Sequence, residues 1–367
     1  MAASLFPKPK AHILKIKEYV AGKTSKDFGQ KKHKTIKLSS NESLWGPCEE
    51  AINGIRRQAG HVNYYPETQS PELKALIASF KGVKPENIVL GNGSNEIIQF
   101  IINSYVSSSE NIIVPEITFS MYQIYAEIFN AKVRIVPNGE NFGIDINAIK
   151  KGITSRTKAI FIANPNNPTG KIINRMELEL FLMGIEKNIL VVIDEAYADF
   201  CEKELKPDLY KLVMSGKYPN LIILKTFSKA FGLAGLRLGY GIASEDIIRN
   251  LARVSQPFNI NSLSSVAAIE SLKKLTHYNK VVAQTIQGRK YIESVLREMD
   301  VEFIESKANF IMLYVKECKE FCETLGSKGV IVRDLCSFNL PGYVRVTISD
   351  NSHNKLFLKL LKEFMKK

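Results

Sequence analysis

Residues 221–240 read LIILKTFSKAFGLAGLRLGY, and the rest of the chain can be organised around this stretch. It opens with an apolar run at 221–224, which has the length and branching of a buried strand. A polar segment broken by glycines follows and carries Lys229. The hydroxyl groups of Thr226 and Ser228, with Arg237 further along, suit an anionic phosphate. The lysine amine can form a Schiff base with an aldehyde cofactor, although a lone loop lysine is more often simply solvated.

Two further apolar runs end in polar motifs. Residues 159–163 lead into NPNNPTG at 164–170, and residues 189–193 lead into DEAY at 194–197. In an open parallel sheet, ligands bind in the crevice at the carboxyl ends of the strands. We therefore expect these strand ends and the one before Lys229 to face one small molecule.

NPNNPTG, DEAY and TFSKAFGLAGLRLGY, in this order, resemble the fold type I aminotransferases that use pyridoxal phosphate. Within that group the sequence is most similar to the histidinol-phosphate aminotransferase subfamily. The resemblance runs from about residue 38 to residue 349, and the three motifs together are far more specific than any one alone. It implies an aspartate aminotransferase-like α/β fold, an amino-group transferase, and pyridoxal 5'-phosphate as the cofactor.

Length and composition suit a globular protein with two domains. The chain has 367 residues, of which 45% are hydrophobic and 24% charged. No apolar run reaches the roughly 18 residues of a membrane span, and residues 1–12 lack the apolar core of a secretory signal. The five cysteines lack the spacing of a disulfide framework or a zinc site. We therefore expect a cytoplasmic protein with no membrane partner and no metal.

The net charge of +13 allows a second class of function, which is binding to nucleic acid. The lysines are spread along the sequence, apart from Lys31, Lys32, Lys34 and Lys37 in an expected loop or arm. No RNA-binding signature or zinc finger accompanies them. A basic surface that attracts phosphate-bearing ligands is the preferred interpretation, and a general bias toward lysine explains the charge as well.

Strand and helix patterns alternate through the first two thirds of the chain, with a helix expected at 175–186 between two of the strands. Such alternation predicts a large domain with a mainly parallel sheet between helices. Short strands and helices then follow in mixed order, which predicts a smaller α+β domain. The predicted divisions are an N-terminal arm packed on the small domain (1–45), a large cofactor-binding domain (46–262) and the small domain (263–367).

A glycine turn opens another expected helix. Residues 91–96 read GNGSNE, between a short strand at 88–90 and an apolar helix at 97–105. A helix start offers backbone N–H groups and the positive end of the helix dipole to a phosphate. Ser94 and Asn95 either cap the helix or bind the cofactor phosphate through their amides, and the basic residues elsewhere in the motifs favour phosphate binding.

The resemblance also implies roles for single residues. Lys229 matches the lysine that holds the cofactor and then acts as a base, and Asp194 matches the acid that keeps the pyridine nitrogen protonated. Asn167 and Tyr197 match donors to the phenolic oxygen, and Phe119 matches the aromatic residue stacked on the ring. The phosphate then falls to Ser94, Asn95, Thr226, Ser228, Arg237 and Tyr65 of the partner subunit. The last contact implies a homodimer with shared active sites.

Residues 43–45 depart from the family pattern. The family usually has Asn-Pro-Tyr after the Asn-Glu pair at 41–42, whereas this chain has Ser-Leu-Trp. An aromatic ring survives at Trp45. As the single tryptophan of the chain, Trp45 either lines the substrate pocket or anchors a core.

Two arginines near the C-terminus imply the substrate. Arg345 in YVRVTIS matches the arginine that grips a substrate carboxylate, and Arg333 in VIVRD matches a second arginine of the histidinol-phosphate subfamily. Otherwise Arg333 is a solvated residue beside Asp334. With Asn167 also reaching the substrate, the set implies transamination between histidinol phosphate and 2-oxoglutarate or glutamate, in histidine biosynthesis. The alternatives with the same machinery are an aromatic amino-acid aminotransferase and a threonine-phosphate decarboxylase.

Overall fold

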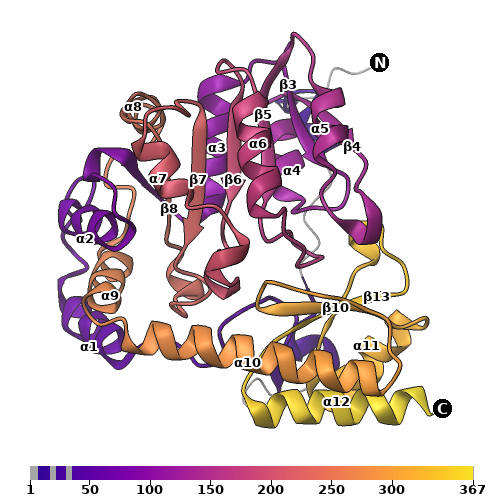
Figure 1. The fold of residues 1–367 in the computed structure, drawn as a ribbon. Coiled ribbons are helices and arrows are strands. Elements are labelled where there is room, and N and C mark those ends of the chain that lie inside the picture. Colours follow the sequence, from indigo (N-terminus) through magenta and orange to yellow (C-terminus); the bar gives the residue numbers. More distant parts are fainter. Residues whose placement is uncertain (1–6, 17–21, 30–34, 367) are drawn as a thin grey trace.

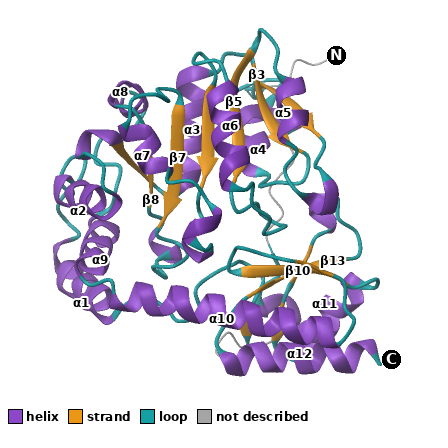
Figure 2. Cartoon of the chain, viewed as in Figure 1, coloured by secondary structure: helices purple, strands orange, loops and turns teal. Residues whose placement is uncertain are grey.

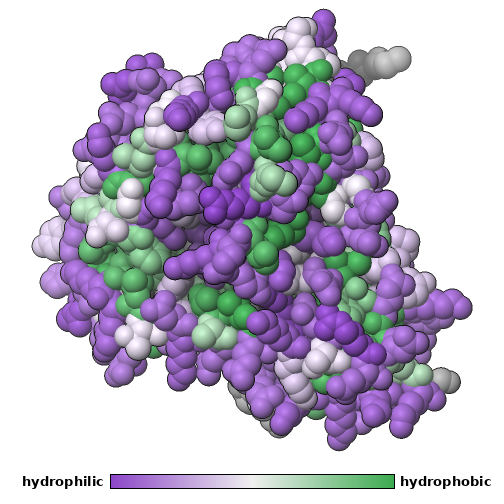
Figure 3. All heavy atoms as spheres, viewed as in Figure 1, coloured by the Kyte–Doolittle hydropathy of each residue, from purple (hydrophilic) through white to green (hydrophobic). Residues whose placement is uncertain are grey.

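The computed structural model describes residues 7–16, 22–29 and 35–366. Within these ranges the chain forms a large region around a seven-stranded sheet and a small region around a four-stranded sheet. The long helix α10 (Thr276–Glu298) runs along the base of both regions (Figure 1). Hydrophilic residues cover most of the face seen in Figure 3. None of the helices in the described ranges combines the length and apolar character that a membrane span requires.

The large sheet has the strand order β2-β8-β7-β6-β5-β3-β4. Its strands are β2 (Ile88–Gly91), β3 (Asn111–Pro115), β4 (Lys132–Val136), β5 (Thr157–Ala163), β6 (Leu190–Asp194), β7 (Leu221–Thr226) and β8 (Gly239–Ile242). Neighbouring strands are parallel, except that β8 is antiparallel to both β2 and β7. Strands buried on both faces read as continuous apolar runs, and for this reason the sequence pattern predicted β5, β6 and β7.

Helices cover both faces of this sheet (Figures 1 and 2). One layer contains α3 (Ser94–Tyr105), α4 (Met121–Ile128) and α8 (Glu245–Ala252), which share a core with Phe161 of β5. The other contains α1 (Glu49–Gln58), α2 (Pro71–Lys81), α5 (Ile146–Gly152), α6 (Arg175–Gly184), α7 (Leu209–Met214) and α9 (Ser262–Lys273). Ile160 and Ile162 of β5 belong to this second core because successive strand residues point to opposite faces.

The small region is built around an antiparallel sheet. Its strands are β9 (Phe303–Ile304), β10 (Phe310–Tyr314), β12 (Arg333–Asp334) and β13 (Tyr343–Thr347), in the order β12-β13-β10-β9. A parallel pair joins β1 (Ile36–Lys37) to β11 (Val330–Ile331). Helices α11 (Cys318–Ser327) and α12 (Asn351–Met365) contribute Phe321 and Phe357 to its core. Short 3-10 turns lie at Ile13–Lys15, Ser25–Phe28, Ala59–His61, Pro85–Asn87, Glu140–Phe142, Ala198–Phe200, Lys203–Leu205, Ala234–Leu236 and Cys336–Phe338.

The architecture is the predicted one, a mainly parallel sheet between helices with a smaller α+β region. The sequence patterns did not predict β8, because its two glycines weaken a strand signal. The fold explains one of them: a Cβ at Gly239 would lie 2.4 Å from the backbone nitrogen of Ser94. Glycine therefore lets the start of α3 pack directly on β8.

The N-terminal segment contacts the small region at the points that are described. Leu38 donates its N–H to the Ile331 oxygen at 2.8 Å, and the Phe28 ring fills the space beside Gly326. Within the N-terminal arm the structure describes a 3-10 turn at Ile13–Lys15, whereas residues 17–20 lie outside the described ranges, as do Lys31, Lys32 and Lys34. The division at residue 262 stays a prediction, and α9, which begins there, packs on α1 and α2.

Candidate active site

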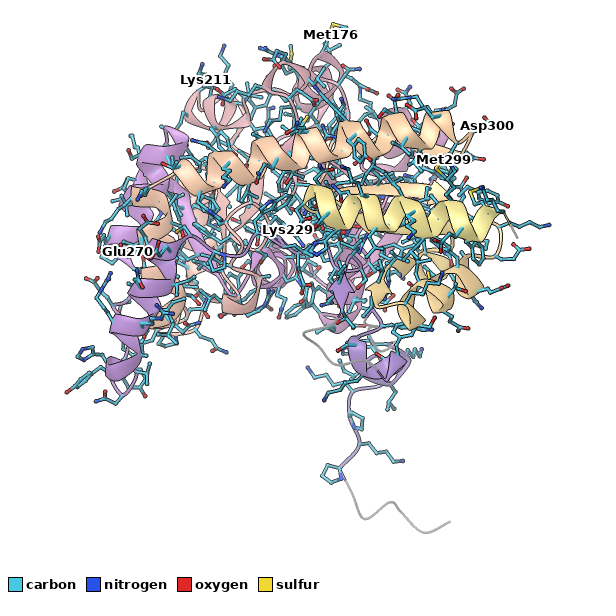
Figure 4. The ribbon with its side chains drawn as sticks, turned by 90° about the horizontal axis from the view of Figure 1, so that it is seen from below. Met176, Lys211, Lys229, Glu270, Met299 and Asp300 are labelled. Atoms are coloured by element: carbon cyan, nitrogen blue, oxygen red, sulfur yellow. The ribbon has the colours of Figure 1, made fainter. Side chains whose placement is uncertain are left out.

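A pocket of about 360 Å³ lies where the carboxyl ends of β5, β6 and β7 face the small sheet. Figure 4 shows Lys229 in the middle of the molecule, whereas Met176 and Lys211 lie at its edge. The structure brings most of the sequence-predicted site residues to this pocket. Those that line it are Ser94, Asn95, Phe119, Asn167, Asp194, Tyr197, Thr226, Ser228, Lys229, Arg237, Arg333 and Arg345.

Lys229 lies in the loop that follows β7. The hydroxyl of Thr226 donates to the hydroxyl of Ser228 at 2.9 Å and accepts the Ser228 N–H at 3.0 Å, so the loop is tied to the strand end. The ammonium of Lys229 donates to the Ser40 carbonyl at 3.4 Å and lies 5.3 Å from the centre of the Tyr197 ring. The amine is therefore half-buried and directed into the pocket rather than out to solvent.

Asp194 ends β6 and forms the buried acid of the site. Tyr122 donates its hydroxyl to Oδ2 at 2.9 Å, and the Ala196 N–H donates to Oδ1 at 3.0 Å. Burial raises the pKa of Asp194 above its ordinary value, although both hydrogen bonds lower it. Burial and the nearby carboxylate raise the pKa of Tyr122 well above its ordinary range, so its hydroxyl stays a donor. A cationic ligand beside Asp194 would restore the charged carboxylate.

The sequence patterns did not predict the role of Tyr122. It is the second residue of α4, three residues after Phe119, which precedes that helix, and the two rings are in edge-to-face contact with centres 5.5 Å apart. A tyrosine three residues after that phenylalanine, at the start of an apolar helix, is the signal that could have found it.

Asn41 is a second residue that sequence reasoning missed. Its side-chain amide donates to the Tyr197 hydroxyl at 3.1 Å, across the interface between the N-terminal segment and the large region. Asn41 has a φ of +54°, a region that asparagine tolerates better than most residues. Tyr197 is also in edge-to-face contact with Phe310 of the small sheet, and the Tyr197 hydroxyl is thereby positioned from both sides.

The start of α3 and Arg237 form a cradle for an anion. Gly93 has a φ of +76°, and a Cβ placed on it would lie 2.7 Å from an Nη atom of Arg237. The guanidinium thus lies directly against the loop backbone, where a larger side chain would displace it. Because the first N–H groups of a helix have no partner inside the helix, this end of α3 offers donors to an anionic group.

The two predicted substrate arginines are neighbours on paired strands. Arg333 and Arg345 are directly opposite each other in the β12–β13 ladder and are 9% and 6% exposed. Arg345 donates to the side-chain oxygen of Asn167 and, at 2.9 Å, to the Ser39 carbonyl. Like charges opposite each other on a sheet repel, so this pair favours an anion between them.

The aminotransferase class I and II family matches this sequence over residues 33–360. The chain belongs to the class I and II aminotransferases. Relatives named histidinol-phosphate aminotransferase from Moorella thermoacetica and Methanocaldococcus jannaschii are 38% and 37% identical to it. These matches cover 98% and 96% of this chain and 93% and 96% of the relatives.

The fold of this aminotransferase also matches a solved structure. That structure is histidinol-phosphate aminotransferase from Sinorhizobium meliloti in complex with pyridoxal-5'-phosphate, with a TM-score of 0.89 at 22% identity over 99% of both chains. The family and the fold class predicted from the sequence are confirmed.

The structure of this aminotransferase corrects the interpretation of Trp45 as a residue of the substrate pocket. It is not among the described residues that line the active-site pocket, and it lies instead in a second pocket with Gln284 and Tyr291 of α10 and Asp350. The reason is local. Asn41 and Glu42 line the active-site pocket, but a turn at 43–46, with Gly46 at a φ of +70°, directs the indole of Trp45 away from that pocket.

Tyr65 is also outside the pocket of its own chain. It is 83% exposed and stacks on Phe258, with ring centres 4.7 Å apart. A large ring held in place at the surface is suited to contact another molecule. The predicted contact with the cofactor phosphate of a partner subunit stays a prediction.

Proposed function

We propose that this aminotransferase transfers an amino group between histidinol phosphate and 2-oxoglutarate, with pyridoxal 5'-phosphate held at Lys229. The observation that carries the proposal is the pair of buried arginines, Arg333 and Arg345, side by side at the pocket that also holds Lys229 and Asp194. The names of the relatives support the same assignment.

The donor set of the pocket fits this cofactor. Arg237, the start of α3 and the hydroxyls of Thr226 and Ser228 would hold its phosphate. Asp194 would hold the protonated ring nitrogen, and this pairing explains why an acid with a raised pKa is tolerated there. Asn167 and Tyr197 would hold the phenolic oxygen, and Phe119 would stack on the ring.

When bound, the cofactor supplies an electron sink for the carbanion formed at the substrate α-carbon. Lys229 would have two tasks: its amine would hold the cofactor, and once freed its Nζ would take the proton from the substrate α-carbon and deliver it to the cofactor's aldehyde carbon. The Ser40 carbonyl, 3.4 Å from Nζ, keeps that amine directed at the pocket. Asn41 fixes the orientation of the Tyr197 hydroxyl.

The arginine pair supports a phosphorylated substrate. A phosphate ester carries about −1.5 to −2 charges near neutral pH and has three acceptor oxygens, so it can use both guanidinium groups. Arg333 donates to the hydroxyl of Ser337 at 3.2 Å, and this contact orients its guanidinium beside Phe338 at the edge of the pocket. Glutamate, the second substrate, needs Arg345 for its α-carboxylate.

The test is a comparison of substrates with one enzyme preparation. With 2-oxoglutarate as acceptor, histidinol phosphate should be converted with a kcat/KM about 100 times that of phenylalanine or tyrosine. The opposite preference would assign an aromatic amino-acid aminotransferase. Release of carbon dioxide from threonine phosphate would assign a decarboxylase. Nucleic-acid binding without any transamination would support the remaining alternative from the net charge.

The proposal includes a cytoplasmic homodimer with shared active sites. Exposed Tyr65, stacked on Phe258, is the contact we assign to the partner. Mixing an inactive Lys229→Ala chain with an inactive Tyr65→Ala chain should restore activity if subunits exchange, because one mixed site then has both residues intact. A fully active monomer in sedimentation would contradict the shared site.

A further inference from the structure

Glu96, the third residue of α3, makes a set of contacts that the catalytic proposal does not use. Its Oε2 accepts the Asn92 N–H at 2.7 Å and the side-chain amide of Asn259 at 2.7 Å. The Asn92 side chain donates to the same carboxylate at 3.2 Å. We call residues 91–95, which precede and open α3, the phosphate loop. The carboxylate of Glu96 therefore holds the phosphate loop from outside the pocket.

The same contacts tie the phosphate loop to a distant segment. The Asn92 side chain also donates to the backbone oxygen and to Oδ1 of Asn259, each at 3.1 Å. The preceding residue, Phe258, has a φ of +54° and carries the stacked ring of Tyr65. Glu96, Asn92 and Asn259 are not among the described residues that line the active-site pocket. They form a brace behind the loop.

The charge of Glu96 opposes a direct role in anion binding. A carboxylate beside a phosphate site repels the phosphate, so electrostatics alone would select a neutral residue there. The helix dipole does favour an acid in the first turn, and this would be a purely structural reason for Glu96. That reason does not explain why the carboxylate accepts hydrogen bonds both from the Asn92 N–H and from the side chain of Asn259, which is 163 residues away in the sequence.

We propose that Glu96 is a positioning residue that holds the phosphate loop in the shape that receives the cofactor phosphate. By engaging the Asn92 N–H and anchoring the loop to Asn259, the carboxylate leaves Gly93, Ser94 and Asn95 to line the pocket. The inference rests on the proposed function only in placing the cofactor phosphate at this loop. The identity of the substrate plays no part in it.

The test compares two ligands that differ only in the phosphate. Apoprotein carrying Glu96→Ala is titrated with pyridoxal 5'-phosphate and with pyridoxal, and binding is followed by absorbance. We expect about a tenfold weaker affinity for pyridoxal 5'-phosphate and less than about a twofold change for pyridoxal. Glu96→Gln, which keeps one acceptor oxygen, should lie between wild type and Glu96→Ala.

Glu177→Ala is the matched control. Glu177 is also the third residue of its helix, α6, and also contacts the residue at the helix start, where Asn174 donates to it at 3.3 Å. It is not among the described residues that line the active-site pocket. Its loss should weaken the helix end without changing either affinity.

Four outcomes would overturn the proposal. Tighter binding of pyridoxal 5'-phosphate by Glu96→Ala would show that charge repulsion dominates. An equal loss of both affinities, or an equal loss in Glu177→Ala, would show general loosening. If Glu96→Ala does not fold, Asn259→Ala removes one partner of the carboxylate and should weaken pyridoxal 5'-phosphate alone by about threefold; no change would overturn the brace. Because no amino substrate is used, these results are independent of whether histidinol phosphate is converted.

Discussion

The two halves of the pocket are built in different ways. The half that we assign to the cofactor, with Lys229, Asp194 and the phosphate loop, comes from strand ends of the large sheet and the segments that follow them. The substrate half, with Arg333 and Arg345, comes from the register of two short antiparallel strands in the small region. In the first half each residue is placed by its own strand end, whereas in the second it is placed by pairing with a neighbour.

This difference has a consequence for function. Changes in the cofactor half should affect every substrate equally, because all of them react at the same cofactor. Changes in the substrate half should distinguish one substrate from another. Substitutions in each half therefore test the contrast, and the loss of Lys229 should have the largest effect.

Lys229→Ala should abolish turnover of both amino substrates, lowering kcat by about 1,000-fold or more, because the covalent anchor and the base are lost together. Borohydride reduction followed by peptide mapping should place the pyridoxyl group on Lys229 in the wild type and find none in the variant. Lys211→Ala, an exposed lysine in a surface ion pair, is the control and should behave as wild type. Label on a different lysine would refute the assignment.

Asp194→Asn should lower kcat/KM for both substrates by about 100-fold, because the neutral amide no longer holds a ring cation. In the apoprotein the same substitution should instead increase the free energy of unfolding. Burial raises the folded-state pKa of Asp194, so wild-type stability falls as pH rises above 3.8 toward that folded value.

Denaturant unfolding of the wild-type and Asp194→Asn apoproteins measures the direction of this stability change. Asp194→Asn should be the more stable apoprotein at pH 7. There the buried carboxyl of the wild type must either carry an unfavourable charge or bind a proton that the unfolded chain does not bind. The advantage should shrink toward pH 4. A variant that is less stable than wild type at pH 7 would mean that the charge of Asp194 is already compensated inside the apoprotein.

Arg333→Ala should separate the substrates. We expect kcat/KM for histidinol phosphate to fall by about 30-fold, or roughly 2 kcal/mol, on the scale of a lost charged hydrogen bond. Glutamate, gripped mainly by Arg345, should lose less than about threefold. Arg156→Ala, at an exposed position, serves as the control. Equal losses for the two substrates would place Arg333 in a structural role.

Tyr122→Phe should have a smaller effect on the cofactor half. Its hydroxyl lowers the pKa of Asp194, so its removal should raise that pKa further and weaken cofactor binding by about fivefold. The loss should grow with falling pH, because more of the carboxyl is then protonated. A pH-independent loss of the same size would instead indicate a packing defect beside Phe161, on which Tyr122 stacks.

Trp45→Phe should leave kcat/KM of both substrates within about twofold of wild type, because the indole lies in the second pocket. Fluorescence of Trp45 in the wild type should change little when a substrate analogue without its own absorbance saturates the enzyme. A large change on saturation would mean that the small region moves on binding and carries α10 or α12 with it.

The cofactor half of the pocket follows from the sequence pattern. Apolar runs mark buried strands, and the polar residues that follow them must meet at one edge of a parallel sheet, so the order of runs and motifs already groups Lys229, Asp194 and Asn167. The family resemblance added Arg333 and Arg345, and the structure brings both to the same pocket.

The residues that support these groups became apparent only in the folded chain. Tyr122 reaches Asp194, Asn41 reaches Tyr197, and Glu96 reaches Asn259, each across a contact between distant segments. The fold also places Trp45 away from the site, at the end of a turn. The physical reason is that a local pattern specifies where a strand or helix begins and ends, whereas the direction of a side chain across an interface depends on how two separately formed elements pack.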